Sequence, residues 1–170
     1  MRLAQIGHWL YRRAENILAL MLAVMFLAFV AQIAFRYLLN FPIGWTSELT
    51  VIMWLWLVLW GAAFVVREDE EIRFDLIYGG VSVGRRRVLA AITAIILLGV
   101  YLMSLPAVWD YVTFMKVQST AYLKIRFDYL FSIYVIFAVA VIVRYAIILW
   151  KALFGRTPEQ FDPTKASSGV

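Results

Sequence analysis

Apolar residues gather in four long runs, and short polar stretches separate them. A helix rises about 1.5 Å per residue, so about 20 apolar residues are needed to cross about 30 Å of hydrocarbon. Each run is long enough, and a helix satisfies its own backbone in the absence of water. The pattern therefore predicts an all-α integral membrane protein with four transmembrane helices in an up-down arrangement, spanning about 17–38, 47–66, 88–110 and 128–150.

Two segments outside the runs have a different character. Residues 2–15 alternate like a surface helix, with Leu3, Ile6 and Leu10 on one face, which predicts an N-terminal interfacial amphipathic helix. Residues 156–170 hold two prolines and no apolar periodicity, so we expect a disordered cytoplasmic tail behind a membrane domain of residues 1–155. The first run exceeds the 7–15 residues typical of a signal peptide, and we expect a retained helix.

Composition supports the same class. Hydrophobic residues make up 64% of the chain and charged residues 16%, whereas soluble domains are near 45–50% and 25%. The net charge of +5 comes from basic residues beside the apolar runs, which is typical of loops facing a phospholipid bilayer and does not indicate a nucleic-acid partner. The absence of cysteine excludes disulfides and thiolate metal sites.

The basic residues also predict an orientation. Eleven of them lie in the N-terminal segment, the second loop and the C-terminal segment, which all fall on one side of the membrane. The other side holds only Arg36, Lys116, Lys124 and Arg126. By the positive-inside rule, both termini are cytoplasmic.

The spans lack the groups that a transporter acting alone needs. Such sites combine ionisable residues with broken helices near the midplane, and here no charge lies near the centre of any span. The single histidine, His8, lies outside the spans, and no cluster of metal ligands or nucleophile–base pair is visible. We therefore expect no enzyme and no cofactor, but a membrane subunit that acts through a partner.

Two alternatives stay open at this point. An autonomous small four-helix exporter would share the helix count, but such proteins carry a glutamate within the first span, and residues 17–35 contain no acid. A membrane anchor or assembly subunit of another complex is the second alternative.

Tryptophans in the second run favour a partner. Trp54, Trp56 and Trp60 lie deep in the span, although tryptophan normally prefers the interface, where its N–H stays hydrated. Trp56 and Trp60 are four residues apart and so share a face. We expect this face to pack against another protein; the alternative is contact with lipid.

The link between the first two runs carries paired charges. Thr46 or Ser47 is placed to cap the second helix, and Glu48 then lies in the first turn, where the helix dipole favours an anion. Arg36 and Glu48 sit at similar depth, which predicts an ion pair across the hairpin.

This link and the segments after it resemble a known family: the small membrane subunit (DctQ-type) of tripartite ATP-independent periplasmic (TRAP) transporters. The residues that carry the resemblance are Phe35-Arg36-Tyr37, Asn40, Pro42, Trp45, Glu48, Trp56, Gly61-Ala62-Ala63, Arg67, Ile72-Arg73, Asp75-Leu76, Ser119, Leu123, Ile125 and Tyr129. The chain departs from the family pattern at Glu71, at Ser82-Val83-Gly84 and at Arg126, where histidine or proline is usual.

The resemblance implies a sodium-driven transporter of an organic acid in the bacterial cytoplasmic (inner) membrane. A periplasmic substrate-binding protein (DctP-type) would capture the acid, and a large membrane subunit (DctM-type) would carry it inward. The small subunit would act as a scaffold for both. The residues implied in partner binding are Arg36, Trp45 and Glu48 at the outer hairpin, Arg67 and Asp75 in the cytoplasmic loop, Trp56 and Trp60 on the large subunit, and Lys116, Lys124 and Arg126 towards the periplasmic protein.

Overall fold

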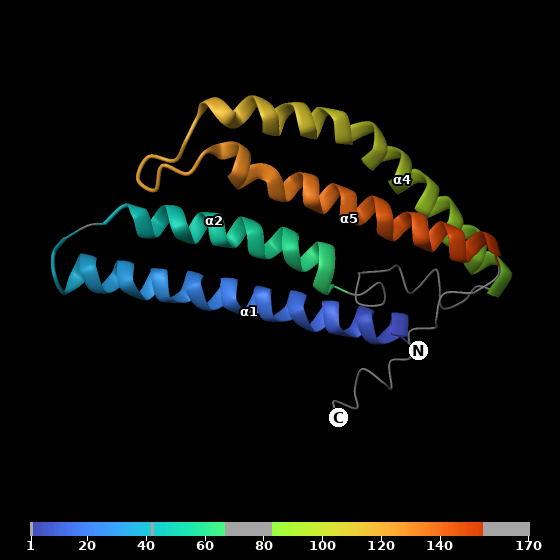
Figure 1. The fold of residues 1–170 in the computed structure, drawn as a ribbon, viewed down its shortest axis with the longest axis horizontal. Helices are drawn as coiled ribbons and strands as arrows, with labels where there is room; N and C mark the ends of the chain where they lie inside the picture. The colour runs from blue at the N-terminus through green and yellow to red at the C-terminus, as the bar shows by residue number, and fades with distance from the viewer. Residues whose placement is uncertain (1, 42, 67–82, 155–170) are drawn as a thin grey trace. The chain divides into compact units, whose positions relative to one another are not determined.

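The computed structural model describes residues 2–41, 43–66 and 83–154. In that part of the chain, four helices are long and apolar enough to cross a membrane (Figure 1). The prediction of an all-α membrane protein is confirmed.

Helices α1, α4 and α5 are longer than the predicted spans, and α2 together with the π-helical turn that follows it covers nearly the predicted span of 47–66. Their bounds are α1 Arg2–Tyr37, α2 Trp45–Trp60, a π-helical turn η1 Gly61–Val65, α4 Val83–Phe114, a 3₁₀ turn η2 Met115–Val117, and α5 Phe127–Phe154. Residues 2–15 are helical and continue into the first span without a break. Their placement at the membrane interface stays a prediction, and the tail of residues 156–170 lies outside the described residues.

Helices α1 and α2 form an antiparallel hairpin (Figure 1). Ala14 and Ala28 of α1 are buried, as is Ala63 of η1, and small residues let helix backbones approach closely in membranes. The π turn closes with the Val66 N–H donating to the Gly61 carbonyl over 2.9 Å, a bond between residues five apart.

The chain divides into two compact units. The first comprises Met1–Val66 and Met103–Ala140, and the second Arg67–Leu102 and Val141–Val170. In the second unit, the Arg87 guanidinium donates to the carbonyls of Ala152 and Leu153. The last four carbonyls of a helix lack partners within the helix, so Arg87 caps α5. The candidate site lies in the first unit.

Candidate functional site

The connection between α4 and α5 is a small hydrogen-bonded loop, called here the α4–α5 loop (residues 118–126). An isolated antiparallel bridge joins Ser119 to Arg126, and the Thr120 N–H donates to the Ile125 carbonyl over 2.9 Å. The buried Thr120 hydroxyl accepts the Ile125 N–H over 3.1 Å. Lys124 takes a left-handed backbone with φ of 54°, which turns the chain. These bonds give the loop a defined backbone.

Glu48 ties this loop to the first turn of α2. Its Oε1 accepts the Tyr122 N–H over 2.9 Å, and its Oε2 accepts the Leu123 N–H over 3.0 Å. Bonds from backbone N–H groups to a carboxylate are charge-assisted and stronger than those between neutral groups. Both carboxylate oxygens are thus used to hold a segment more than 70 residues away.

Gly44 makes room for the same loop. It precedes α2 with ordinary right-handed backbone angles (φ −89°, ψ −24°), so its conformation does not require glycine. A Cβ added at this position would instead overlap the ring of Tyr122. Glycine is therefore needed at position 44 because the Tyr122 ring approaches too closely to leave room for a side chain.

The predicted side-chain cap of α2 is wrong. Thr46 and Ser47 use their hydroxyls as donors to carbonyls three residues earlier: Thr46 to Ile43 over 3.2 Å, and Ser47 to Gly44 over 2.7 Å. The helix begins at Trp45, one residue before Thr46, so both hydroxyls already lie inside its first turn. Thr46 is fully buried there.

The predicted ion pair across the hairpin is also not formed between these two described residues. Glu48 is occupied by the α4–α5 loop, and the Arg36 guanidinium lies 5.9 Å from the centroid of the Tyr37 ring, within range of a cation–π contact. The prediction rested on the similar depth of Arg36 and Glu48 in the membrane. The two N–H donors of the loop instead take both oxygens of the Glu48 carboxylate. Trp45, the first residue of α2, is 41% exposed.

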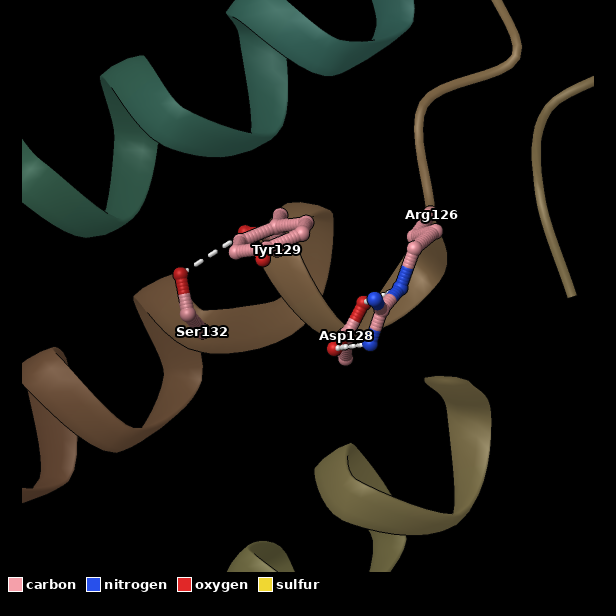
Figure 2. Close-up of polar contacts among 4 residues, drawn as sticks. All are labelled: Arg126, Asp128, Tyr129 and Ser132. Carbon is pink, nitrogen blue, oxygen red and sulfur yellow. Dashed lines mark hydrogen bonds and ion pairs between the residues drawn. The ribbon is translucent and has the colours of Figure 1, made fainter. Parts of the chain in front are cut away.

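Three basic residues predicted to face a partner lie on or beside the α4–α5 loop. Lys116 and Lys124 are exposed. The Arg126 side chain already has contacts within the chain, because its guanidinium pairs with Asp128 at 2.6 Å and lies 5.1 Å from the centroid of the Tyr129 ring. Figure 2 shows this pair at the start of α5, with Ser132 donating to the Tyr129 carbonyl one turn later.

Trp56 and Trp60 make contacts within the chain. The Trp56 indole N–H donates to the Leu130 carbonyl of α5 over 3.0 Å, and that of Trp60 to the Ala14 carbonyl of α1 over 3.3 Å. Both side chains are half-buried. Their contact with a partner stays a prediction, but each already stabilises the fold.

Two predicted site residues, Arg67 and Asp75, lie outside the described residues, as does Pro42 of the hairpin. The sequence reasoning missed Tyr122 and Thr120, and the contact that Gly44 makes. Gly44 and Tyr122 meet across distant segments, which no local pattern reveals, whereas Thr120 bonds within the loop to Ile125.

The arrangement is suited to recognition. Among the residues that the structure describes, no group of three or more histidine, cysteine or acidic side chains could hold a metal ion. The polar groups at this end of the hairpin instead bond to backbone groups and fix the position of an exposed loop. A loop held in this way presents a constant surface to another molecule.

The fold and this site together define a multi-pass helical membrane protein with a structured loop at one end of its helices. The chain belongs to the DctQ component family of the tripartite ATP-independent periplasmic transporters, whose family profile matches residues 25–155. The matched range includes the hairpin, Glu48 and the whole α4–α5 loop.

The chain is also similar to a curated protein, the C4-dicarboxylate TRAP transporter small permease protein DctQ of Vibrio cholerae serotype O1, with 29% identity over 108 residues. The alignment covers 64% of this chain and 47% of the relative. The aligned part of the chain thus spans about half the length of that relative.

Proposed function

We propose that this chain is the small permease subunit of a sodium-driven TRAP transporter, where it serves as a scaffold. The transporter would import an organic acid, for example a dicarboxylate, a keto acid or a sugar acid. The observation that carries the proposal is the family match over residues 25–155. The relative from Vibrio cholerae, named as a C4-dicarboxylate transporter component, supports a carboxylate substrate.

A scaffold role is supported by where the charged and polar groups lie. The charges near the hairpin sit at the ends of helices, and Glu48 is used to hold a loop. Large apolar side chains such as Leu20, Phe26 and Leu27 of α1 are more than half exposed, which suits contact with lipid or with another membrane protein. In this proposal the small subunit is the scaffold, and the large membrane subunit (DctM-type) would carry the substrate.

The α4–α5 loop is proposed to support docking of the periplasmic substrate-binding protein (DctP-type). With both termini in the cytoplasm of the bacterium, this loop faces the periplasm across the inner membrane. Lys116 and Lys124 are exposed positive charges at this end, and each would favour an acidic group on the docking protein.

The test is uptake into proteoliposomes assembled from the small subunit, the large subunit and the periplasmic protein. With an inward sodium gradient, a labelled C4-dicarboxylate or another organic acid should accumulate, and omission of any protein or collapse of the gradient should abolish uptake. Full uptake without this chain would contradict the scaffold role. Uptake that is indifferent to sodium would contradict the proposed driving force alone.

A further inference from the structure

Helix α1 is longer than the membrane is thick. It covers Arg2–Tyr37, 36 residues and so about 54 Å, whereas the hydrocarbon of a bilayer is about 30 Å thick. The antiparallel span beside it, Trp45–Val65, has 21 residues and a length of about 31 Å, which matches that thickness. The end of this shorter span at Val65 therefore marks the membrane boundary near the N-terminal part of α1.

A contact between the two helices gives the depth of Arg13. The Trp60 indole N–H donates to the Ala14 carbonyl over 3.3 Å. Trp60 lies five residues before Val65, so Ala14 is about 7 Å inside the boundary. The Arg13 guanidinium reaches back towards the N-terminus and lies 5.2 Å from the centroid of the Trp9 ring, which is one helical turn, about 5.4 Å, further out. The Arg13 charge therefore lies at about the level where hydrocarbon meets headgroups.

Arg13 and its neighbour Arg12 are available to bind an anion. Both side chains are exposed, and in the described part of the chain neither guanidinium is paired with a carboxylate. Glu15 is the one acidic residue of α1, and it lies two positions after Arg13, on the far side of the helix. A guanidinium is planar and carries five N–H donors that match the geometry of a phosphate.

The surroundings of the two arginines suit a lipid headgroup. Trp9 is 57% exposed and Leu10 is 55% exposed, so apolar surface stands beside the two charges. Tryptophan prefers the membrane interface, where its ring contacts apolar groups and its N–H stays hydrated. Two cations without a nearby acid favour a headgroup with a net negative charge over a zwitterionic one. Charge therefore selects the occupant here, unlike on the purely apolar faces of the spans.

We propose that Arg12 and Arg13, together with the Trp9 ring, form a binding site for the phosphate of an anionic phospholipid in the leaflet at the N-terminal end of α1. With both termini cytoplasmic, this is the cytoplasmic leaflet. The guanidinium groups donate to the phosphate oxygens, and the Trp9 ring holds Arg13 at headgroup depth. The site would fix how far α1 protrudes from the membrane. The inference does not depend on the proposed function.

Native mass spectrometry of the full chain tests the site. The purified protein is titrated in detergent with phosphatidylglycerol or with phosphatidylcholine of the same acyl chains. The wild-type chain should retain phosphatidylglycerol more tightly. Combined Arg12→Gln and Arg13→Gln should lower its apparent affinity for phosphatidylglycerol by about tenfold or more, since each basic residue near a membrane surface contributes about fivefold. Trp9→Leu should lower it by about threefold, the size of an exposed cation–π contact.

Matched variants separate a site from general charge attraction. Combined Lys116→Gln and Lys124→Gln remove the same charge at the other end of the helices and should leave the affinity for phosphatidylglycerol unchanged. Combined Arg12→Lys and Arg13→Lys keep the charge and should recover part of the affinity. The melting temperature of each variant in detergent should stay close to that of the wild-type chain, which shows that the fold is retained.

Three results would overturn the proposal. In the first, the wild-type chain retains both lipids equally well. In the second, the arginine variant binds phosphatidylglycerol as tightly as the wild-type chain does. In the third, the lysine-to-glutamine variant loses as much affinity as the arginine variant, because the preference would then come from net charge and not from a site at the N-terminal end of α1.

Discussion

Glu48 shows how a single side chain can be recognised from sequence while its partners are not. Its position in the first turn of a membrane helix marked it as important, since a carboxylate there is favoured by the helix dipole. Its partners are the N–H groups of Tyr122 and Leu123, more than 70 residues away. A local pattern carries no information about such a contact, and the nearest opposite charge, Arg36, was the wrong choice.

Replacing Glu48 should release the α4–α5 loop. Glu48→Ala removes both acceptors and Glu48→Gln keeps only one, so the Tyr122 and Leu123 amides should exchange with solvent faster, with the larger increase in Glu48→Ala. Hydrogen exchange read by mass spectrometry on peptides covering residues 118–127 measures this. Glu15→Gln, which changes an exposed carboxylate on α1, is the control and should leave the exchange of these peptides unaffected.

The same Glu48→Gln variant is expected to weaken assembly with the partner subunits or uptake of the substrate. Unchanged hydrogen exchange, co-purification and transport would contradict the role assigned to Glu48.

Gly44 gives a second test at the same scale, because its role is steric. In Gly44→Ala the added methyl group meets the Tyr122 ring, which must shift; overpacking a core costs about 1–3 kcal/mol, and the loss here should lie at or below the lower end because the Tyr122 side chain is exposed. The melting temperature in detergent should fall, and a second substitution, Tyr122→Ala, should restore part of the loss. Gly99→Ala is the matched control, since a Cβ there has no neighbour within 4 Å. Equal effects of the two alanines would show that the loop does not pack on Gly44.

Arg126 allows a structural role to be separated from a contact with a partner. Its pair with Asp128 is half exposed on the arginine side, at 50%, and exposed pairs contribute only about 0–1 kcal/mol. Arg126→Ala should therefore change the melting temperature little. Reduced uptake in that variant, measured at normal stability, would support contact with the periplasmic protein; a large loss of stability would show that Arg126 is structural instead.

At the scale of elements, hydrophobic patterning predicted the four spans but not their full lengths. Helix α4 runs over Val83–Phe114, past both ends of the predicted span at 88–110. The spans were drawn from apolar runs, but a helix continues through polar residues such as Arg85 and Asp110 where its backbone bonds are intact. The π turn at Gly61–Val65 was not predicted, because an apolar run does not distinguish a π turn from an α-helix; Gly61 and Ala63 in this turn are buried.

The tryptophans of α2 yield a prediction at this scale. Trp60→Phe and Trp56→Phe each remove an indole bond between helices, which should destabilise the isolated chain by about 0.5–1.5 kcal/mol. Trp54→Phe removes no bond within the described chain and should be neutral. Thermal unfolding of the three purified variants in one detergent gives the comparison. If Trp54→Phe destabilised the chain and Trp60→Phe did not, the result would contradict the conclusion that the Trp60 indole bond, and not Trp54, stabilises the fold.

At the scale of the whole molecule, the sequence predicted the fold class and the family, and both are now shown. The fold class could be predicted because the length of an apolar run reflects the thickness of the bilayer. The family could be predicted because its motifs are spread over most of the chain. The contact surfaces could not be predicted in the same way. Whether an apolar residue in a span faces its own chain, lipid or a partner depends on how the helices are rotated, and a uniformly apolar run does not record that rotation.

The central claim is that this chain works as a scaffold bound to a large membrane subunit. The most direct test is to tag the chain, solubilise its native membranes in a mild detergent and determine the mass and composition of what co-purifies. We predict one large polytopic membrane protein in roughly stoichiometric amount. A homogeneous assembly that contains only copies of this chain would contradict the claim.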